Sequence, residues 1–454
     1  MTALADPAAN RHSVSFGAAA RVWLRIGLLG FGGPAGQIAL MHKVVVEEKR
    51  WIGEERFLHA LNYCTLLPGP EAQQLATYVG WLLHGTRGGL TAGTLFILPG
   101  AAAILALSVV YVTVGHVPLI AGMFLGLKAA VLALVVEAVL RVGRRALRTG
   151  VARLVAVVAF IALFVFAAPF PAVVLAAGAF GYAWTRSGRS GFRAGAHGAG
   201  AAPEAMPVID DAALYRAMPG AGRALRLLAI WLPLWFLPMA VAALWLGPQH
   251  LYVQAGLFFA GMAVVTFGGA YAVLAYVAQR AVVDFGWLTG AQMLDGLALA
   301  ETTPGPLILV VQFVAFVAGY QSDGMTGGLI AAGIALWATF VPCFLWIFLG
   351  APPYVETLRH QATLAGALAA ITAAVVGVIA NLALWFALHA LFARVSAAPV
   401  PGTQLRLPDL ASIDWLLASL TLLALLLTFT ARWPTSRTLL VMAALGIAVR
   451  VVGA

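Results

Sequence analysis

The motifs Phe31-Gly32-Gly33 and Pro68-Gly69-Pro70 recur later in the chain, at one constant spacing, as Phe267-Gly268-Gly269 and Pro304-Gly305-Pro306. The residues that match are those that interrupt helices, and both copies lie inside strongly apolar segments. Apolar segments interrupted by Gly or Pro, in corresponding halves of one chain, are typical of transporters that bind substrate between two repeats. The duplication therefore predicts a fold class and a class of function together.

The composition is that of a membrane protein. The chain has 454 residues, is 62% hydrophobic, has a mean hydropathy of +0.94 and carries 10% charged residues. Soluble domains usually carry about 25% charged residues. The net charge of +10 is interpreted through the positions of the arginines, which orient the protein in the bilayer, and we expect no nucleic-acid partner. Dispersed cysteines and histidines predict no disulfide, no metal site and no other cofactor.

Repeated apolar stretches predict an all-α polytopic membrane protein with about 13 transmembrane helices in two inverted homologous repeats with broken helices. The first two predicted spans, residues 18–46 and 57–84, contain the breaks, as do their counterparts 253–283 and 293–320. An odd number of spans between the starts of the two copies inverts the second copy. The remaining predicted spans are 90–114, 119–140, 154–168, 171–184, 225–246, 329–349, 364–391, 413–429 and 439–452.

The domain boundaries follow from these spans. An N-terminal tail (1–15) precedes the first repeat (16–185). A linker (186–224) rich in Gly, Ala and Arg and an unpaired connecting helix (225–247) lead to the second repeat (248–454).

Arginine positions predict an N-terminus in the cytoplasm. Arginines cluster after the fourth predicted span (141–153) and in the linker (186–226), whereas the loops 115–118 and 169–170 carry no Lys or Arg. The loop 43–56 departs from this pattern, because its basic residues lie on the opposite side in this topology. No apolar segment beside a cleavage site begins the chain, so we expect no cleaved signal peptide.

The breaks predict an anion site. Backbone that is interrupted at membrane depth must line a cavity or be buried in protein. Pro34 and Pro70 suit the first turn of a new helix, whose free N–H groups and positive dipole end would point at the break. Up to four such ends near the midplane make an anion-binding geometry. The alternative is that Gly and Pro only permit close packing or kinks.

Three charged residues near the breaks or within the spans have functional interpretations. Glu71 and Glu301 are candidate proton carriers, and the alternative is local pairing with free helix N–H groups. Lys128 stands in the middle of a span, so we expect its partner to be a bound anion or a carboxylate on another helix. A structural lysine neutralised by burial is the alternative. Glu137 and Arg141 are predicted to form an ion pair at the end of that span.

The motifs Gly30-Phe-Gly-Gly-Pro34, Trp51-Ile52 and Leu67-Pro-Gly-Pro-Glu71, with their echoes Thr266-Phe-Gly-Gly269 and Thr303-Pro-Gly-Pro306, resemble the chromate ion transporter (CHR) family in its long, two-domain form. The likeness covers most of the chain outside the tail and linker. The second copy departs from the first at Ala270, which stands where the first has Pro34. The resemblance implies a secondary active transporter or antiporter that exports chromate across the bacterial inner membrane and confers chromate resistance.

We expect substrate contacts at the breaks and at Lys128. The predicted residues are Phe31, Gly32, Gly33, Gln37, Pro68, Gly69, Pro70, Glu71, Gln74, Lys128, Phe267, Gly268, Gly269, Thr303, Pro304, Gly305 and Pro306.

Other functions stay open at this point. Sulfate or another tetrahedral oxyanion matches chromate in charge and shape. An anion channel is a second class, although the closed helix breaks and the carboxylates favour coupled transport. An intramembrane enzyme acting on phosphorylated lipids would need concentrated acid–base or metal-ligand groups, which the sequence lacks, so we expect no enzyme. The lipid bilayer is the expected surrounding, and the sequence leaves a homodimer open.

Overall fold

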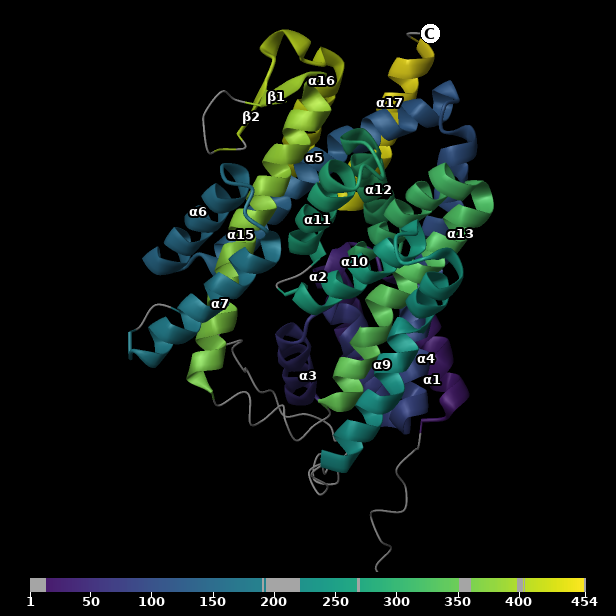
Figure 1. Ribbon diagram of the computed structural model, residues 1–454, viewed down its shortest axis with the longest axis vertical. Coiled ribbons are helices and arrows are strands. Elements are labelled where there is room, and N and C mark those ends of the chain that lie inside the picture. The colour runs from purple at the N-terminus through teal and green to yellow at the C-terminus, as the bar shows by residue number, and fades with distance from the viewer. Residues whose placement is uncertain are drawn as a thin grey trace, which may run out of the picture.

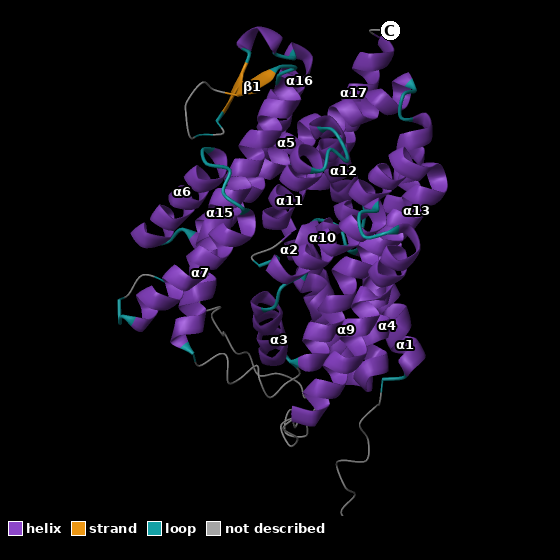
Figure 2. Cartoon of the chain, in the orientation of Figure 1, coloured by secondary structure: helices purple, strands orange, loops and turns teal. Residues whose placement is uncertain are grey.

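The computed structural model describes residues 14–189, 192, 221–267, 270–350, 361–397, 403 and 405–452. The described chain is almost entirely helical (Figure 2). Two short strands, β1 (Val395–Ala397) and β2 (Arg406–Pro408), pair as an antiparallel hairpin near α16 (Figure 1). The all-α class is therefore confirmed. Most of the predicted tail and linker, together with Gly268 and Gly269, lie outside the described residues.

The helices follow the order of the predicted segments. The first half contains α1 (Phe16–Leu29), α2 (Gly33–His42), α3 (Glu54–Leu66), α4 (Glu71–Val114), α5 (Pro118–Ala146), α6 (Gly150–Phe164) and α7 (Phe170–Arg186). The second part contains α9 (Ala221–Leu246), α10 (Leu251–Val265), α11 (Ala270–Ala278), α12 (Gly290–Thr302), α13 (Val310–Leu349), α15 (Ala362–Leu391), α16 (Trp415–Leu425) and α17 (Thr435–Val452). Short π turns (Lys43–Glu48, Gln279–Asp284, Leu426–Thr430) and 3₁₀ turns (Leu307–Leu309, Leu410–Ser412) complete them.

Six described helices are long and apolar enough to cross a bilayer, which makes this a multi-pass membrane protein. They are Glu71–Val114, Pro118–Ala146, Gly222–Leu246, Leu307–Leu349, Ala362–Leu391 and Thr435–Val452. The count of thirteen stays a prediction, because several predicted spans are divided into helices shorter than the about 20 residues that a bilayer requires. For example, α1 has 14 residues and α3 has 13.

The sequence repeat is also a repeat of structure. The π turns Lys43–Glu48 and Gln279–Asp284 lie at the same spacing as the two sequence motifs, and so do helices α3 and α12. In each copy a glycine with positive φ interrupts the long helix that follows, Gly85 (φ 61°) in α4 and Gly324 (φ 65°) in α13. The second copy differs by the 3₁₀ turn Leu307–Leu309, which is inserted before α13.

The first break of each repeat is the tip of a helical hairpin, which corrects the predicted interrupted spans. Beyond the break, Glu48 approaches Arg25 of α1 to 3.7 Å, and the ring centroids of Trp51 and Trp23 lie 6.0 Å apart. Helix α2 therefore runs back along α1 instead of continuing in its direction. In the second copy the ring of Trp287 lies 6.2 Å from that of Phe259 in α10.

The second break is likewise a hairpin tip. A Cβ atom on Gly296 of α12 would lie 2.3 Å from the ring of Phe313, so the start of α13 runs back beside α12. In the first copy the rings of Tyr63 and Tyr78 approach in the same way, with centroids 6.0 Å apart. The breaks turn the chain back because glycines there take left-handed φ values, which other residues adopt at a cost.

The long helices α4 and α13 also reverse direction, at His84-Gly85 and at Asp323-Gly324. A Cβ atom on Gly88 would lie 2.2 Å from the carbonyl oxygen of Gly80, so the two arms of α4 pack with their backbones in contact. Glycine permits this close approach, as small residues do between membrane helices. The turn that the sequence predicts between 57–84 and 90–114 is therefore confirmed, although its flanking segments appear as one element.

Candidate functional site

The hairpin tips of the two repeats meet one another. The backbone N–H of Gly305 donates to the carbonyl of Gly30, and the N–H of Gly69 donates to the carbonyl of Thr266, each over 2.9 Å. Thr266 occupies the position of Gly30 in the second copy, and Gly305 occupies that of Gly69. The two hydrogen bonds are therefore the same contact made twice, with the repeats exchanging roles. Reciprocal contacts of this kind are those of a two-fold interface.

The backbone at the tips has the geometry that glycine supplies. The φ angles are 85° at Gly32, 68° at Gly33, 121° at Gly69 and 94° at Gly305. A Cβ atom on Gly69 would lie 2.9 Å from Cys343 Sγ and from Gln74 Nε2, whereas the space beside Gly32 and Gly33 is open.

The proline at each tip does not always open the next helix as predicted. Pro34 lies in the first turn of α2, which confirms the prediction there. Pro70 stands one residue before α4 begins, as its N-cap. Pro306 is followed by the 3₁₀ turn Leu307–Leu309 before α13 starts, so the second copy presents no α-helical N-terminus directly after its Pro-Gly-Pro motif. The inserted turn is the physical reason.

Two of the predicted glutamines hold the tips together. The buried Gln37 donates its amide N–H groups to the carbonyls of Gly30 (3.2 Å) and Gly305 (2.5 Å). Gln74 donates to the carbonyl of Pro68 over 2.7 Å. The amide oxygens of both side chains are buried without a hydrogen-bond partner among the described residues. In this conformation the donors that an anion would use are therefore bound to the backbone.

The other predicted residues at the tips differ in exposure. Phe31 is 47% exposed, Phe267 is half-buried, and Thr303 is buried with its hydroxyl donating to the carbonyl of Ala300. Pro304 packs against α4, because a Cβ atom on Gly100 would lie 2.2 Å from its carbonyl oxygen. The Phe31-Gly-Gly tip of the first copy is thus open on one side, and the Pro304-Gly-Pro tip of the second copy is enclosed.

The two candidate proton carriers lie beside the tips in different surroundings. Glu71 is the first residue of α4, and no hydrogen bond joins its carboxylate to another described residue. Glu301, near the end of α12, accepts a short hydrogen bond from the hydroxyl of Tyr271 in α11. Glu301 is therefore paired locally by a tyrosine instead of by helix N–H groups.

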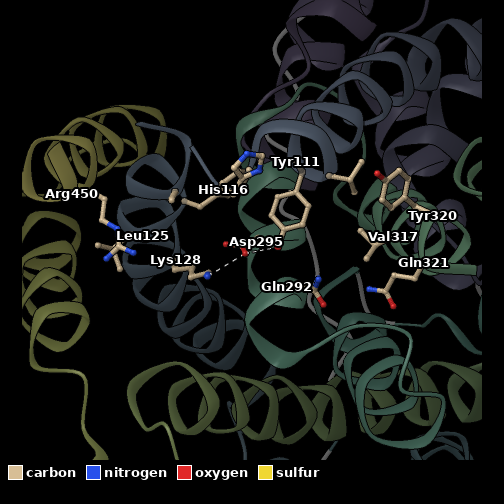
Figure 3. Close-up of a pocket in the computed structure, with 14 residues that line it drawn as sticks. Tyr111, His116, Leu125, Lys128, Gln292, Asp295, Val317, Tyr320, Gln321 and Arg450 are labelled. Atoms are coloured by element: carbon tan, nitrogen blue, oxygen red, sulfur yellow. Dashed lines mark hydrogen bonds and ion pairs between the residues drawn. The ribbon is translucent and has the colours of Figure 1, made fainter. Parts of the chain in front are cut away.

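Lys128 does not stand alone, because its ammonium nitrogen lies 3.2 Å from Oδ2 of Asp295 in α12 (Figure 3). The hydroxyl of Tyr111 in α4 donates to the same oxygen over 3.0 Å. The side chain of Asp295 is 5% exposed and that of Lys128 is 21% exposed. Asp295 Oδ1 is buried without a partner among the described residues. Of the two predicted partners, the structure shows a carboxylate on another helix.

This ion pair lies in a cavity of about 560 Å³ between α4, α5, α12, α13 and α17. Figure 3 shows Lys128 reaching toward Asp295, with Gln292 one turn away on the same helix. Phe124 and Val317 form apolar parts of the wall. Further polar or charged side chains that line the cavity are His116, Tyr320, Gln321 and Arg450. The lining thus combines two cations, Lys128 and Arg450, with the Asp295 carboxylate, amide N–H donors and apolar walls, which is the composition of a small-molecule site.

Small residues on α5 place Lys128 in this cavity. A Cβ atom on Gly126 would lie 1.8 Å from the carbonyl of Met442 in α17, and one on Gly122 would lie 2.7 Å from that of Gly446. On the opposite side, the ring of Phe313 packs on Gly296 and lies 5.1 Å from the ring of Tyr111. These contacts fix the helices that carry the lysine, the carboxylate and the phenol.

Asp295 is the functional candidate that the sequence interpretation missed. It stands as a single carboxylate among apolar residues, in Leu294-Asp295-Gly296-Leu297. An ionisable residue inside a membrane segment is by default a functional candidate. That rule would have found it, as it found Lys128. The pairing itself could not be foreseen, because the two residues belong to different repeats.

A second cavity, of about 590 Å³, lies further along α5 and is strongly basic. Arg141 pairs with Glu137 there, as the sequence predicts. Three further arginines line it, Arg144, Arg145 and Arg432. Its lining attracts anions electrostatically. Among the residues that the structure describes, no group of three or more His, Cys, Asp or Glu side chains could hold a metal ion.

Comparisons with known proteins show the family to which the chain is related. A protein-family model described as Chromate transporter matches residues 18–182 and 253–449. The chain is similar to the chromate transport protein of Pseudomonas aeruginosa, with 32% identity over 79% of this chain and 77% of that protein. It is also similar to the chromate transport protein of Cupriavidus metallidurans, with 29% identity over 80% of this chain and 81% of that protein. No solved structure matches the chain.

Proposed function

The chain belongs to the chromate transporter family, and we propose that it is a secondary active transporter that exports chromate across the bacterial inner membrane and so confers chromate resistance. The observation that carries the proposal is the partly accessible Lys128 in a membrane cavity of about 560 Å³. A cation is costly at this depth unless it serves an ion pathway or pairs with a counter-ion.

The hairpin tips are a second, separate part of the proposed substrate path, because none of their described residues lines the Lys128 cavity. Helix α2 begins directly at the first-copy tip and α4 begins directly after Pro70, so free N–H groups and two positive dipole ends face the meeting point of the repeats. Helix ends supply only about half a unit charge each, so a dianion needs a full cation as well. We assign that role to Lys128 and backbone contact to the predicted tip residues.

Coupling to protons is assigned to the carboxylates beside the tips. Glu71 lies at the start of α4 without a described hydrogen bond, and Glu301 is bound to Tyr271. A proton carried inward by either residue while chromate moves outward would make the protein an antiporter. Glu301→Gln then separates coupling from binding, since it should retain chromate binding and lose acceleration of transport by a proton gradient.

The hairpins support a cytoplasmic N-terminus. Because a hairpin returns to the side from which it started, the connection 49–53 lies on the same side as the start of α1. The basic residues Lys43, Lys49, Arg50 and Arg56, which the sequence interpretation placed outside, then join the arginines after α5 and α7 on the cytoplasmic side. The one discordant loop of the predicted topology becomes concordant.

Inversion of the second repeat follows from the same topology. In each repeat, two predicted spans are replaced by hairpins that do not cross the membrane. Because crossings are removed two at a time, the number of crossings between the starts of the two repeats stays odd. The reciprocal hydrogen bonds Gly30–Gly305 and Thr266–Gly69 support this arrangement. Cysteine labelling should place Arg144 and Lys49 inside the cell and Gln249 outside. Labelling of Lys49 from outside would contradict the hairpin, and labelling of Arg144 and Gln249 from one side would contradict the inversion.

Anion uptake into inverted membrane vesicles tests the function. Export from the cell predicts chromate accumulation in the vesicles, with a rate that depends on imposed pH or potential gradients. Sulfate is measured in the same preparation, because it matches chromate in charge and shape. Absence of gradient-dependent chromate uptake would contradict the proposal, and faster uptake of sulfate than of chromate would reassign the substrate.

A further inference from the structure

The proposed function assigns the ammonium group of Lys128 to the substrate. In the structure this group already forms an ion pair with Asp295. The ammonium nitrogen lies 3.2 Å from Asp295 Oδ2, which is within the distance of an ion pair. Tyr111 fixes the carboxylate in this position from the other side. The charge of Lys128 is therefore neutralised by a side chain from the other repeat.

A dianion cannot simply join this pair. An oxyanion in contact with Lys128 would lie beside the Asp295 carboxylate, and like charges in a site of low dielectric constant repel strongly. The carboxylate is almost fully buried, so water cannot screen it. Either the anion stays out or Asp295 gives up its negative charge.

We propose that Asp295 is an internal competitor of the transported oxyanion, and that the anion binds Lys128 only when Asp295 releases this ion pair and takes up a proton. The inference rests on the proposed function and adds a residue to it. The proton has a defined place, because Asp295 Oδ1 is buried without a hydrogen-bond partner among the described residues. It comes from solvent hydronium, whose O–H bond breaks and leaves water as the new O–H bond on Asp295 forms.

Other titratable groups near Asp295 bear on the pH dependence. Those that line the same cavity are Lys128 of α5, Tyr111 of α4, His116 of the α4–α5 turn, Tyr320 of α13 and Arg450 of α17. His389 of α15 lies against Gly290 at the start of α12 and hydrogen-bonds the carbonyl of Trp385. The Asp295→Asn variant keeps all of these groups, so its pH profile reports what they contribute to binding.

The competition has a consequence for the transport cycle. When Asp295 is ionised again it re-forms its bond to Lys128, which displaces the anion from the cavity. A proton taken up from the side on which the anion binds moves with the anion. Asp295 therefore serves to release the anion. The proton that moves in the opposite direction is carried by Glu71 and Glu301, not by Asp295.

Chromate binding to purified full-length protein tests the inference. Asp295→Asn should bind chromate about tenfold more tightly than wild type at pH 8, because the competitor is neutral. Between about pH 7.5 and about pH 9, wild-type affinity should fall by up to about tenfold per pH unit, because one proton is bound with each anion. The Asp295→Asn variant should show no such slope. Asp284→Asn, which removes the exposed partner of Arg280, is the matched control and should bind as wild type.

Two further variants separate competition from a structural role. Tyr111→Phe leaves the carboxylate in place and removes one hydrogen bond from it, so chromate affinity should rise severalfold. The exchanged pair, Lys128→Asp with Asp295→Lys, is compared with the two single substitutions. If the pair is only structural, the exchange should regain both the thermal stability and the chromate binding that each single substitution loses. Unchanged or weaker binding by folded Asp295→Asn would overturn the inference while leaving the proposed function intact. Absence of chromate binding by wild type would overturn both.

Discussion

The hairpin tips and the charged cavity are built on opposite principles. The tips make a symmetric contact, since the hydrogen bond between Gly30 and Gly305 is repeated by Thr266 and Gly69. The cavity is asymmetric. Asp295 occupies the position that His59 has in the first repeat, and Lys128 of the first repeat reaches across to it.

This difference separates scaffold from chemistry. Backbone turns made by glycine and proline can be duplicated without cost, because they add no charge to the membrane interior. A second buried lysine and carboxylate would add charges that must each be desolvated. In the proposed function the two sets of tips form the interface between the repeats, and the single charged site recognises the substrate.

The largest effect is expected at the symmetric tips. Gly69→Val should abolish chromate transport, because φ is 121° and a Cβ atom would lie 2.9 Å from Cys343 Sγ and from Gln74 Nε2. Gly33→Val should also abolish transport. The space beside Gly33 is open, so the effect there comes from backbone strain alone. Vesicle uptake, normalised to membrane expression, measures both.

Gly261→Val is the control for these substitutions. It makes the same chemical change in α10, where nothing lies within 4 Å and φ is not in the left-handed region. Transport by Gly69→Val at the rate of this control would show that the tips do not contribute to the path.

An intermediate effect is expected where the symmetry of the tips is broken. Gln37 donates to the carbonyls of Gly30 and Gly305, whereas the second copy has Val273 at the corresponding position. Gln37→Leu should lower the free energy of unfolding by about 1–3 kcal/mol, because buried carbonyls lose their donor. Thermal unfolding of purified protein measures the change. Val273→Leu, which alters no hydrogen bond, should have less effect, and equal losses would contradict a specific role for Gln37.

The smallest effect is expected from conservative exchange within the cavity. Lys128→Arg keeps the charge but replaces a compact ammonium by a planar guanidinium, so chromate transport should be reduced and still measurable. Its pairing with Asp295 should persist, with little change in thermal stability. Complete loss of transport would show that the geometry of the ammonium matters as much as its charge.

The sequence predicts more of the scaffold than of the site. Glycine and proline mark the tips directly, and apolar stretches mark the helices. Reversal at a tip could not be predicted, because an apolar segment looks the same whether it continues or turns back. Lys128 was found because a lone lysine in a span is conspicuous. Its ion pair with Asp295 depends on how α5 and α12 pack. Close contacts of α5 glycines with α17, and of Gly296 with Phe313, determine that packing.

Equilibrium binding of chromate to purified protein tests the central claim, that Lys128 supplies the charge that holds the transported anion. Lys128→Gln should bind chromate more weakly by about 2–5 kcal/mol, or roughly thirtyfold or more. Because this change leaves Asp295 buried without its cation, the double variant Lys128→Gln with Asp295→Asn controls for stability. It should fold as wild type and bind chromate more weakly than Asp295→Asn by the same factor. Affinity equal to that of Asp295→Asn in the folded double variant would contradict the account.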